Sequence, residues 1–176
     1  VPMAREIVSN INRLAAACRQ AGAAVAWVQV TVSPEDGDDY WPGLLAHVNT
    51  KERAALFLEA LADGSHGHAL WPELEVKDGD IVVNKNRYSA FLPGASPLVG
   101  ELRARDIDTV IITGTLTNVC CESSARDAMM TDFKTIMISD ANATVHDQDH
   151  LATLSTFFQV FGDVFSTDEL VDILAP

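Results

Sequence analysis

The sequence lacks the features that mark several common functional classes. Positive charge is scarce, with 12 lysines and arginines against 25 aspartates and glutamates, for a formal net charge of −13. No basic run is present that could follow a phosphate backbone, so nucleic acid is not an expected partner. Also absent are an apolar run of about 18 residues, which could span a membrane, and a start that resembles a signal peptide. We therefore expect a cytoplasmic protein without a membrane partner.

Cysteine is also scarce, and its arrangement argues against disulfides and metals. The three cysteines are Cys18, Cys120 and Cys121, an odd number in which two neighbours are poorly placed to pair with each other. No CxxC and no His/Cys cluster at zinc-ligand spacing occurs. His66 and His68 would supply only two ligands from a flexible loop. We expect reduced thiols, no metal and no cofactor.

The sequence TGTLTN at 113–118 raises the possibility of a nucleotide site, because it follows an apolar run and precedes a helical segment. It lacks the second and third glycines of GxGxxG, and no GK[ST] follows, so neither a dinucleotide site nor a P-loop is indicated. The GxSxG motif of serine hydrolases is missing as well.

What the sequence does contain is a regular alternation of strand-like and helical segments. At 176 residues and 48% hydrophobic composition, it is long enough for one domain with a buried core. Strands are predicted at 23–32, 80–85, 107–114, 134–141 and 163–166. Helices are predicted at 2–21, 51–64, 96–105, 118–133, 149–162 and 166–174. This pattern predicts a single domain over residues 1–176, an α/β fold with a three-layer α/β/α sandwich and a mostly parallel, doubly wound, Rossmann-like sheet.

The order of elements has one irregularity at its beginning. A doubly wound domain ordinarily begins with a strand, whereas this sequence opens on the helix predicted at 2–21. The simplest explanation is a first strand upstream of residue 1. The alternative is a truncated, inactive chain without that strand.

The paired cysteines lie where the third predicted strand turns into a helix, at an edge of the sheet where ligands bind. Cys120 falls in the first helical turn, where unpaired N–H groups and the helix dipole favour a thiolate. Cys121 lies about 100° further round, in line with Ala125, Ala128 and Met129, and is expected in the core. Position alone leaves Cys120 as either a reactive thiol or a buried small hydrophobe.

Two segments, taken together, resemble the isochorismatase-like cysteine hydrolases. They are TGTLTNVCCESSARDA followed by FKTIMISDANAT, and VVNKNRYSAF earlier in the chain. The likeness covers essentially the whole chain and implies the isochorismatase-like fold. It also implies that Cys120 is the nucleophile and that Lys85 is its charge partner, whereas position alone also allows Lys85 to be a solvated strand end.

The resemblance implies further site residues. Backbone N–H groups of Leu116 and Cys120 would form the oxyanion hole, beside a non-proline cis peptide at Thr115–Leu116. The residues implied near the substrate are Asn86, Arg87, Tyr88, Ser89, Phe91, Thr115 and Thr117. For some of them, such as Phe91, a place in the core is the alternative.

The sequence also departs from the family pattern. The third catalytic residue of the family is an aspartate in an N-terminal strand, and no aspartate precedes Asp36, so this residue is expected upstream of Val1. The loop at 33–43 lacks the histidines with which nicotinamidase-like members bind a metal.

Family members that cleave the vinyl ether of isochorismate often lack the cysteine, so the resemblance implies hydrolysis of a small amide or ureido substrate. CCESSARDAMM and DANAT look closest to ureidoacrylate and N-carbamoyl amidohydrolases of the family. The alternatives are a vinyl-ether hydrolase of the isochorismatase type, a redox-sensing thiol protein, and a non-catalytic scaffold or oligomerisation domain. Apolar helices at 51–61 and 153–162 suit a homodimer or homotetramer, although sheet packing explains them equally well. Trp27, Trp41 and Trp71 could each belong to the core, the pocket or an interface.

Overall fold

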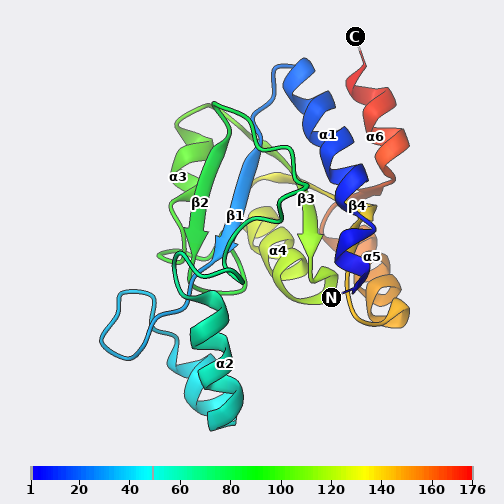
Figure 1. Cartoon of the computed structure of the whole chain (residues 1–176). Coiled ribbons are helices and arrows are strands. Elements are labelled where there is room, and N and C mark those ends of the chain that lie inside the picture. Colours follow the sequence, from blue (N-terminus) through cyan, green and yellow to red (C-terminus); the bar gives the residue numbers. More distant parts are fainter. Residues whose placement is uncertain (1, 49, 176) are drawn as a thin grey trace.

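The computed structural model describes residues 2–48 and 50–175 (Figure 1). Its strands are β1 (Ala26–Val30), β2 (Ile81–Lys85), β3 (Thr109–Thr115), β4 (Lys134–Ala143) and β5 (Asp163–Phe165). Its α-helices are α1 (Val8–Gln20), α2 (Lys51–Leu61), α3 (Leu98–Arg103), α4 (Glu122–Met130), α5 (Asp147–Val160) and α6 (Thr167–Leu174). Shorter helical segments are η1 (Pro2–Arg5), η2 (Gly43–Val48) and η3 (Thr117–Cys121). Each strand and helix predicted from the sequence is present, with ends shifted by a few residues.

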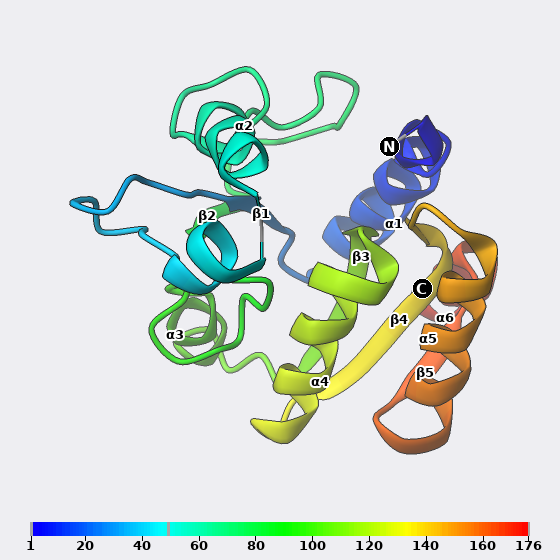
Figure 2. The ribbon, with the colours of Figure 1, turned by 90° about the horizontal axis from the view of Figure 1, so that it is seen from below.

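The strands are parallel, as predicted, but they form two sheets instead of one. β1 pairs with β2 in the first sheet, and β3, β4 and β5 pair in that order in the second. Within the described part of the chain, β1 and β3 share no ladder of hydrogen bonds. Figure 2 shows these two strands next to each other with no strand between them. The described strands therefore form two parallel sheets, and the strand expected upstream of residue 1 is not among them.

Helices cover both faces of the three-stranded sheet. On one face, Leu14 of α1 and Leu170 of α6 pack against Ile138 of β4. On the other, Ala125 of α4 and Phe157 of α5 pack in a second buried cluster. This sandwich of helix, sheet and helix is the predicted three-layer arrangement (Figures 1 and 2).

A third buried cluster joins the two sheets through side chains. Val83 of β2 and Val110 of β3 belong to it, together with Phe91, Leu98 of α3 and Phe133. The rings of Phe91 and Phe133 meet edge to face, with their centroids 5.5 Å apart. In the described residues, apolar packing holds β2 near β3, because strand pairing does not connect the sheets.

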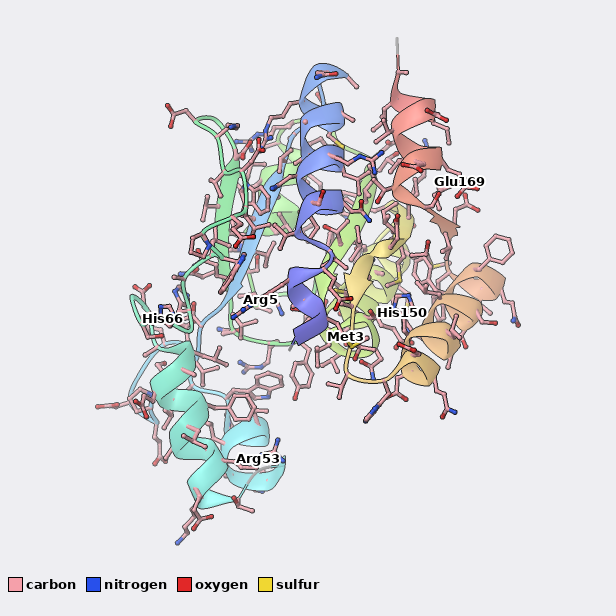
Figure 3. The ribbon with its side chains drawn as sticks, turned by 45° about the vertical axis from the view of Figure 1, so that its right-hand side comes forward. Met3, Arg5, Arg53, His66, His150 and Glu169 are labelled. Atoms are coloured by element: carbon pink, nitrogen blue, oxygen red, sulfur yellow. The ribbon has the colours of Figure 1, made fainter. Side chains whose placement is uncertain are left out.

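The segment formed by η2 and α2 projects from the body as an arm (Figure 1). None of the residues of α2 is buried, and Leu56 is 63% exposed. Figure 3 shows Arg53 on this arm, away from the two sheets. None of the described helices, here or elsewhere, combines the length and the apolar character needed to cross a membrane.

A partly buried ion pair ties α1 to the two-stranded sheet. The Asp80 carboxylate accepts hydrogen bonds from Arg19 at 3.0 and 2.6 Å, from Trp27 Nε1 at 2.7 Å and from the Lys77 amide at 2.9 Å. The Arg19 guanidinium is the main reason that the pKa of Asp80 lies well below its ordinary value. Trp27 therefore belongs to the core, which is one of the three places that the sequence left open for it.

Candidate active site

The turn that carries the paired cysteines connects β3 to α4. The Thr115–Leu116 peptide bond is cis, as the family resemblance implied. The Leu116 carbonyl then accepts hydrogen bonds from the amides of Val119 at 3.1 Å and Cys121 at 3.2 Å. The two donor amides belong to the residues on either side of Cys120. Their bonds form a wide first helical turn, which keeps the Cys120 backbone close to the end of β3.

Two side-chain hydrogen bonds fix this turn to the neighbouring elements. Thr117 Oγ1 and His150 Nδ1 of α5 share one of 3.0 Å, and Thr144 Oγ1 donates to Asn118 Oδ1 at 2.6 Å. Neither Thr117 nor Asn118 caps the following helix, because Leu116 is the N-cap residue and both polar side chains are used in these tertiary contacts. Figure 3 shows His150 near the start of α5. The end of β4 and the start of α5 thereby position the turn.

The two adjacent cysteines have different environments. Cys121 is 4% exposed and packs with Ala125 in the core, as predicted, whereas Cys120 is partly exposed. Burial is the main reason that the pKa of Cys121 is raised. Met129, expected in the same buried stripe, is 38% exposed, because the stripe ends at Ala128 and Met129 lies about 100° further toward solvent.

Lys85 ends β2 as a buried cation and not as a solvated strand end. It is 5% exposed, and Nζ donates to the carbonyls of Arg87 at 3.0 Å and Tyr88 at 2.6 Å. In the part of the chain that the structure describes, no carboxylate lies within ion-pair distance of it. Its positive charge is the smallest of the causes that set the pKa of Cys121, and it opposes the rise that burial produces.

The residues after Lys85 form a polar and aromatic loop. Burial is the main cause that raises the pKa of Tyr88, and the charge of Cys120 is the second. The rings of Tyr88 and Trp41 meet edge to face at 4.6 Å. The Arg87 guanidinium lies over the Trp41 ring at 5.3 Å from its centroid, and Asn86 Nδ2 donates to Asp39 Oδ1 at 3.2 Å.

Three of the residues expected near the substrate are enclosed by protein. Phe91 is 2% exposed in the core, which is the alternative that the sequence left open. Ser89 is 5% exposed and its Oγ accepts from the Phe91 amide at 3.1 Å, while Thr117 has no exposed surface. These buried side chains support the loop and the turn from inside the protein. The accessible set is Asn86, Arg87, Tyr88 and Thr115.

Sequence reasoning left open or missed several residues that build the site. The pocket was one of three alternatives for Trp41, and His150 was not expected there. Both are distant in sequence from the motifs that they contact, so no local pattern marks them. Ser124 Oγ accepts from the Ala90 amide at 3.1 Å and thereby joins α4 to the loop after Lys85. Its spacing of three residues from Cys121 places it on the same helix face, which could have identified it.

No metal-binding group is present in residues 2–48 and 50–175, where no three His, Cys, Asp or Glu side chains are grouped suitably. His68 is buried and shares a 2.9 Å hydrogen bond with Thr31 Oγ1, while His66 is exposed. An open hollow beside the start of α5 is lined by Met3, Val145, His146, Asp147 and Gln148. It does not reach Cys120 or Lys85, so its lining does not define the reactive site.

Comparisons with known sequences identify the family of the chain. The model of the isochorismatase domain matches residues 1–169. The ureidoacrylate amidohydrolase RutB of Methylobacterium radiotolerans is 32% identical over 95% of this chain and 68% of its own length. RutB of Klebsiella pneumoniae is 32% identical over 100% of this chain and 78% of its own length.

Solved structures show the same fold. A cysteine hydrolase from Pseudomonas syringae pv. phaseolicola superposes with a TM-score of 0.84 at 30% identity, covering 99% of this chain and 82% of its own. The N-carbamoylsarcosine amidase from Thermoplasma acidophilum gives a TM-score of 0.75 at 25% identity, covering 96% of this chain and 83% of its own.

Proposed function

The chain belongs to the isochorismatase family, and we propose that it is a cysteine-dependent amidohydrolase that cleaves a small amide or ureido C–N bond. The observation that carries the proposal is the position of the partly exposed Cys120 in the turn after β3 and of the buried Lys85 at the end of β2, two strands that the buried cluster around Val83 and Val110 holds together. The names of the relatives, an amidohydrolase and an amidase, support the same bond type.

The proposed reaction is acyl transfer through a thioester. Cys120 Sγ loses its proton to a general base and attacks the substrate carbonyl, while the Lys85 ammonium stabilises the thiolate. The N–H groups of Leu116 and Cys120 bind the developing oxyanion, and one such donor is worth about 3 kcal/mol. The C–N bond breaks as the nitrogen takes a proton and leaves as ammonia or an amine. Water then hydrolyses the thioester and restores the thiol.

The general base is proposed to be an aspartate on a strand upstream of Val1. A parallel strand between β1 and β3 would pair with both edges and join the two sheets into one. Its carboxyl end would face the cysteine turn and Lys85, whose ammonium has three N–H donors and uses two of them on the Arg87 and Tyr88 carbonyls. Intact mass of the native protein tests this: a value well above 19.0 kDa supports the upstream strand, and a value of 19.0 kDa contradicts it.

The function itself is tested by ammonia release over a panel of ureido acids, primary amides and isochorismate. Cys120→Ala should lower kcat/KM on the best substrate by about 10³-fold or more, because it removes the nucleophile. Cys121→Ala is the matched control, since that thiol packs in the core. It should keep kcat/KM within a few-fold and lower the free energy of unfolding by about 1 kcal/mol.

Other outcomes would overturn the proposal in distinct ways. Turnover of isochorismate without ammonia release would favour the vinyl-ether hydrolase. If the full-length protein turned over none of the panel, and iodoacetamide labelled Cys120 no faster than Cys18, the scaffold alternative would be favoured.

A further inference from the structure

Helix α5 carries apolar side chains on two faces. Leu154 and Phe157 are buried in the cluster against the three-stranded sheet. Leu151 and Phe158 face solvent and are 65% and 63% exposed. Together with Ser155 they lie at i, i+4 and i+7 and form the outer stripe of α5. Sheet packing explains the buried pair, but it leaves this stripe in contact with water, which is unfavourable.

The outer stripe is free of charge in a strongly acidic protein. Residues 151–162 contain no Asp, Glu, Lys, Arg or His, whereas the whole chain has a formal net charge of −13. Two polar side chains of this segment bond to each other, since Gln159 Nε2 donates to Ser155 Oγ at 3.2 Å. Because two copies of an acidic chain repel each other, contact between copies is least opposed where charge is absent.

Helix α6 shows the contrasting arrangement. Ile173 is 62% exposed, close to the value for Phe158, but Glu169 one turn before it and Asp172 beside it are exposed as well. A twofold axis through α6 would bring these carboxylates against their own copies, and like charges at close range repel. Burial of Ile173 against a second copy would therefore be opposed by charge, whereas burial of Phe158 would not.

We propose that the outer stripe of α5 binds the same stripe of a second copy of this chain. Figures 1 and 2 show α5 at the margin of the molecule, where a second copy can reach it. Two copies related by a twofold axis present the same surface to each other. With the axis beside Ser155, the two helices run antiparallel and Phe158 of one copy lies against Leu151 of the other. Ser155 is small, so the helices can approach closely at the axis.

The size of the stripe sets the strength expected of this dimer. A helix of 14 residues is about 21 Å long. One face of it buries less than the roughly 800 Å² per partner of a standard interface. Monomer and dimer should therefore exchange, with a Kd on the order of micromolar. The contact uses no reacting group, so the inference is independent of the proposed function.

The test is sedimentation velocity of the native full-length protein over a range of concentrations, which measures the Kd of the dimer. Phe158→Glu should raise this Kd about 100-fold or more, because it replaces an apolar contact by a charge and the twofold axis repeats the change. Leu151→Lys should weaken the dimer in the same way. The double variant should bind itself at least about tenfold more tightly than Phe158→Glu, since each new ammonium would face a new carboxylate of the other copy.

Ile173→Glu is the matched control, because it makes the same kind of change at an equally exposed position of α6. Its Kd should equal that of the wild type. A wild-type protein that stayed monomeric at about 100 μM would overturn the inference, as would a dimer that Phe158→Glu did not weaken. A double variant no tighter than Phe158→Glu would contradict the antiparallel pairing.

Urea unfolding of the same variants separates this dimer from a contact within one chain. We expect Phe158→Glu to unfold at nearly the wild-type urea concentration when both proteins are diluted to monomers, because the side chain is exposed there. A marked loss of stability in the monomer with an unchanged Kd would mean that another part of the same polypeptide covers the stripe, and it would overturn the inference.

Discussion

The two sheets of this protein differ in how completely their residues are buried. In the three-stranded sheet, the successive residues Met137 and Ile138 of β4 point to opposite faces, and neither has exposed surface. In the two-stranded sheet, Val83 of β2 is 6% exposed while its neighbour Val82 is 52% exposed. Helices cover both faces of the first sheet, whereas the second has a covered face and an open one.

The candidate site takes one part from each region. The three-stranded sheet supplies the cysteine turn, anchored through Thr117 and Asn118. The two-stranded sheet supplies Lys85 and the loop that follows it. Because no strand pairing joins the two sheets in the described residues, the distance between Cys120 and Lys85 depends on the cluster around Val83 and Val110 and on the hydrogen bond from the Ala90 amide to Ser124.

Truncating a core residue of the three-stranded region gives the strongest test of this difference in burial. Phe157→Ala removes a ring with no exposed surface, and it should lower the free energy of unfolding by about 3–5 kcal/mol. Leu56→Ala on the projecting arm is the counterpart, and it should change the same quantity by less than about 0.5 kcal/mol. Urea unfolding measures both. A large loss for Leu56→Ala would mean that the arm is covered in solution, for example by a second copy.

Substitution at Lys85 tests the contribution of the two-stranded region to catalysis. Lys85→Met should lower kcat/KM by about 10²-fold or more, near 3 kcal/mol, because the positive charge beside the thiol is lost. Asn84→Ala, at the exposed neighbouring position, should leave kcat/KM nearly unchanged. If Lys85→Met retained wild-type turnover, the cation would have no role in the chemistry.

Removing the Asp80 charge tests how firmly the two-stranded region is held to α1. Asp80→Asn should lower the free energy of unfolding at pH 7 by about 2 kcal/mol, because Arg19 loses its carboxylate. The pKa of Asp80 is depressed on folding, so its contribution is complete above the ordinary value of 3.8 and is lost as the pH falls toward the folded-state pKa.

The difference between wild type and Asp80→Asn should therefore shrink between about pH 4 and pH 2, measured by urea unfolding across that range. A difference that stayed constant with pH would show that the ionic bonds of Asp80 do not produce it.

The smallest expected effect concerns the anchoring of the cysteine turn. Thr144→Val keeps the shape of the side chain but leaves Asn118 Oδ1 without its donor, at a cost of about 1 kcal/mol in unfolding free energy. We expect kcat to fall a few-fold, because the turn loses one of its two side-chain anchors. An unchanged kcat with the expected loss of stability would limit this bond to a structural role.

The sequence predicted the features that depend on residues close together in the chain. Apolar runs predicted every strand, and the two motifs led to Cys120, Lys85 and the cis bond at Thr115–Leu116. The sequence indicated that one strand is missing, but the place of the break, between β1 and β3, could not be predicted, because strand order depends on pairing between distant segments. The packing of Trp41 on Tyr88 was missed for the same reason.

Burial was the other limit of prediction. The family pattern placed Phe91 and Thr117 near the substrate, and both are enclosed, because a motif does not tell whether a residue supports a pocket or lines it.

The hydrogen bonds of Lys85 have a consequence for how new specificities could arise. Its ammonium holds the carbonyls of Arg87 and Tyr88, and backbone carbonyls are present whatever the side chains are. Side chains at these two positions can therefore be exchanged while the loop keeps its path and the charge stays beside the thiol. Selection could therefore change the substrate that the enzyme binds without changing its catalytic groups. A mutant library restricted to these two positions would test new substrates with little loss of catalytic activity.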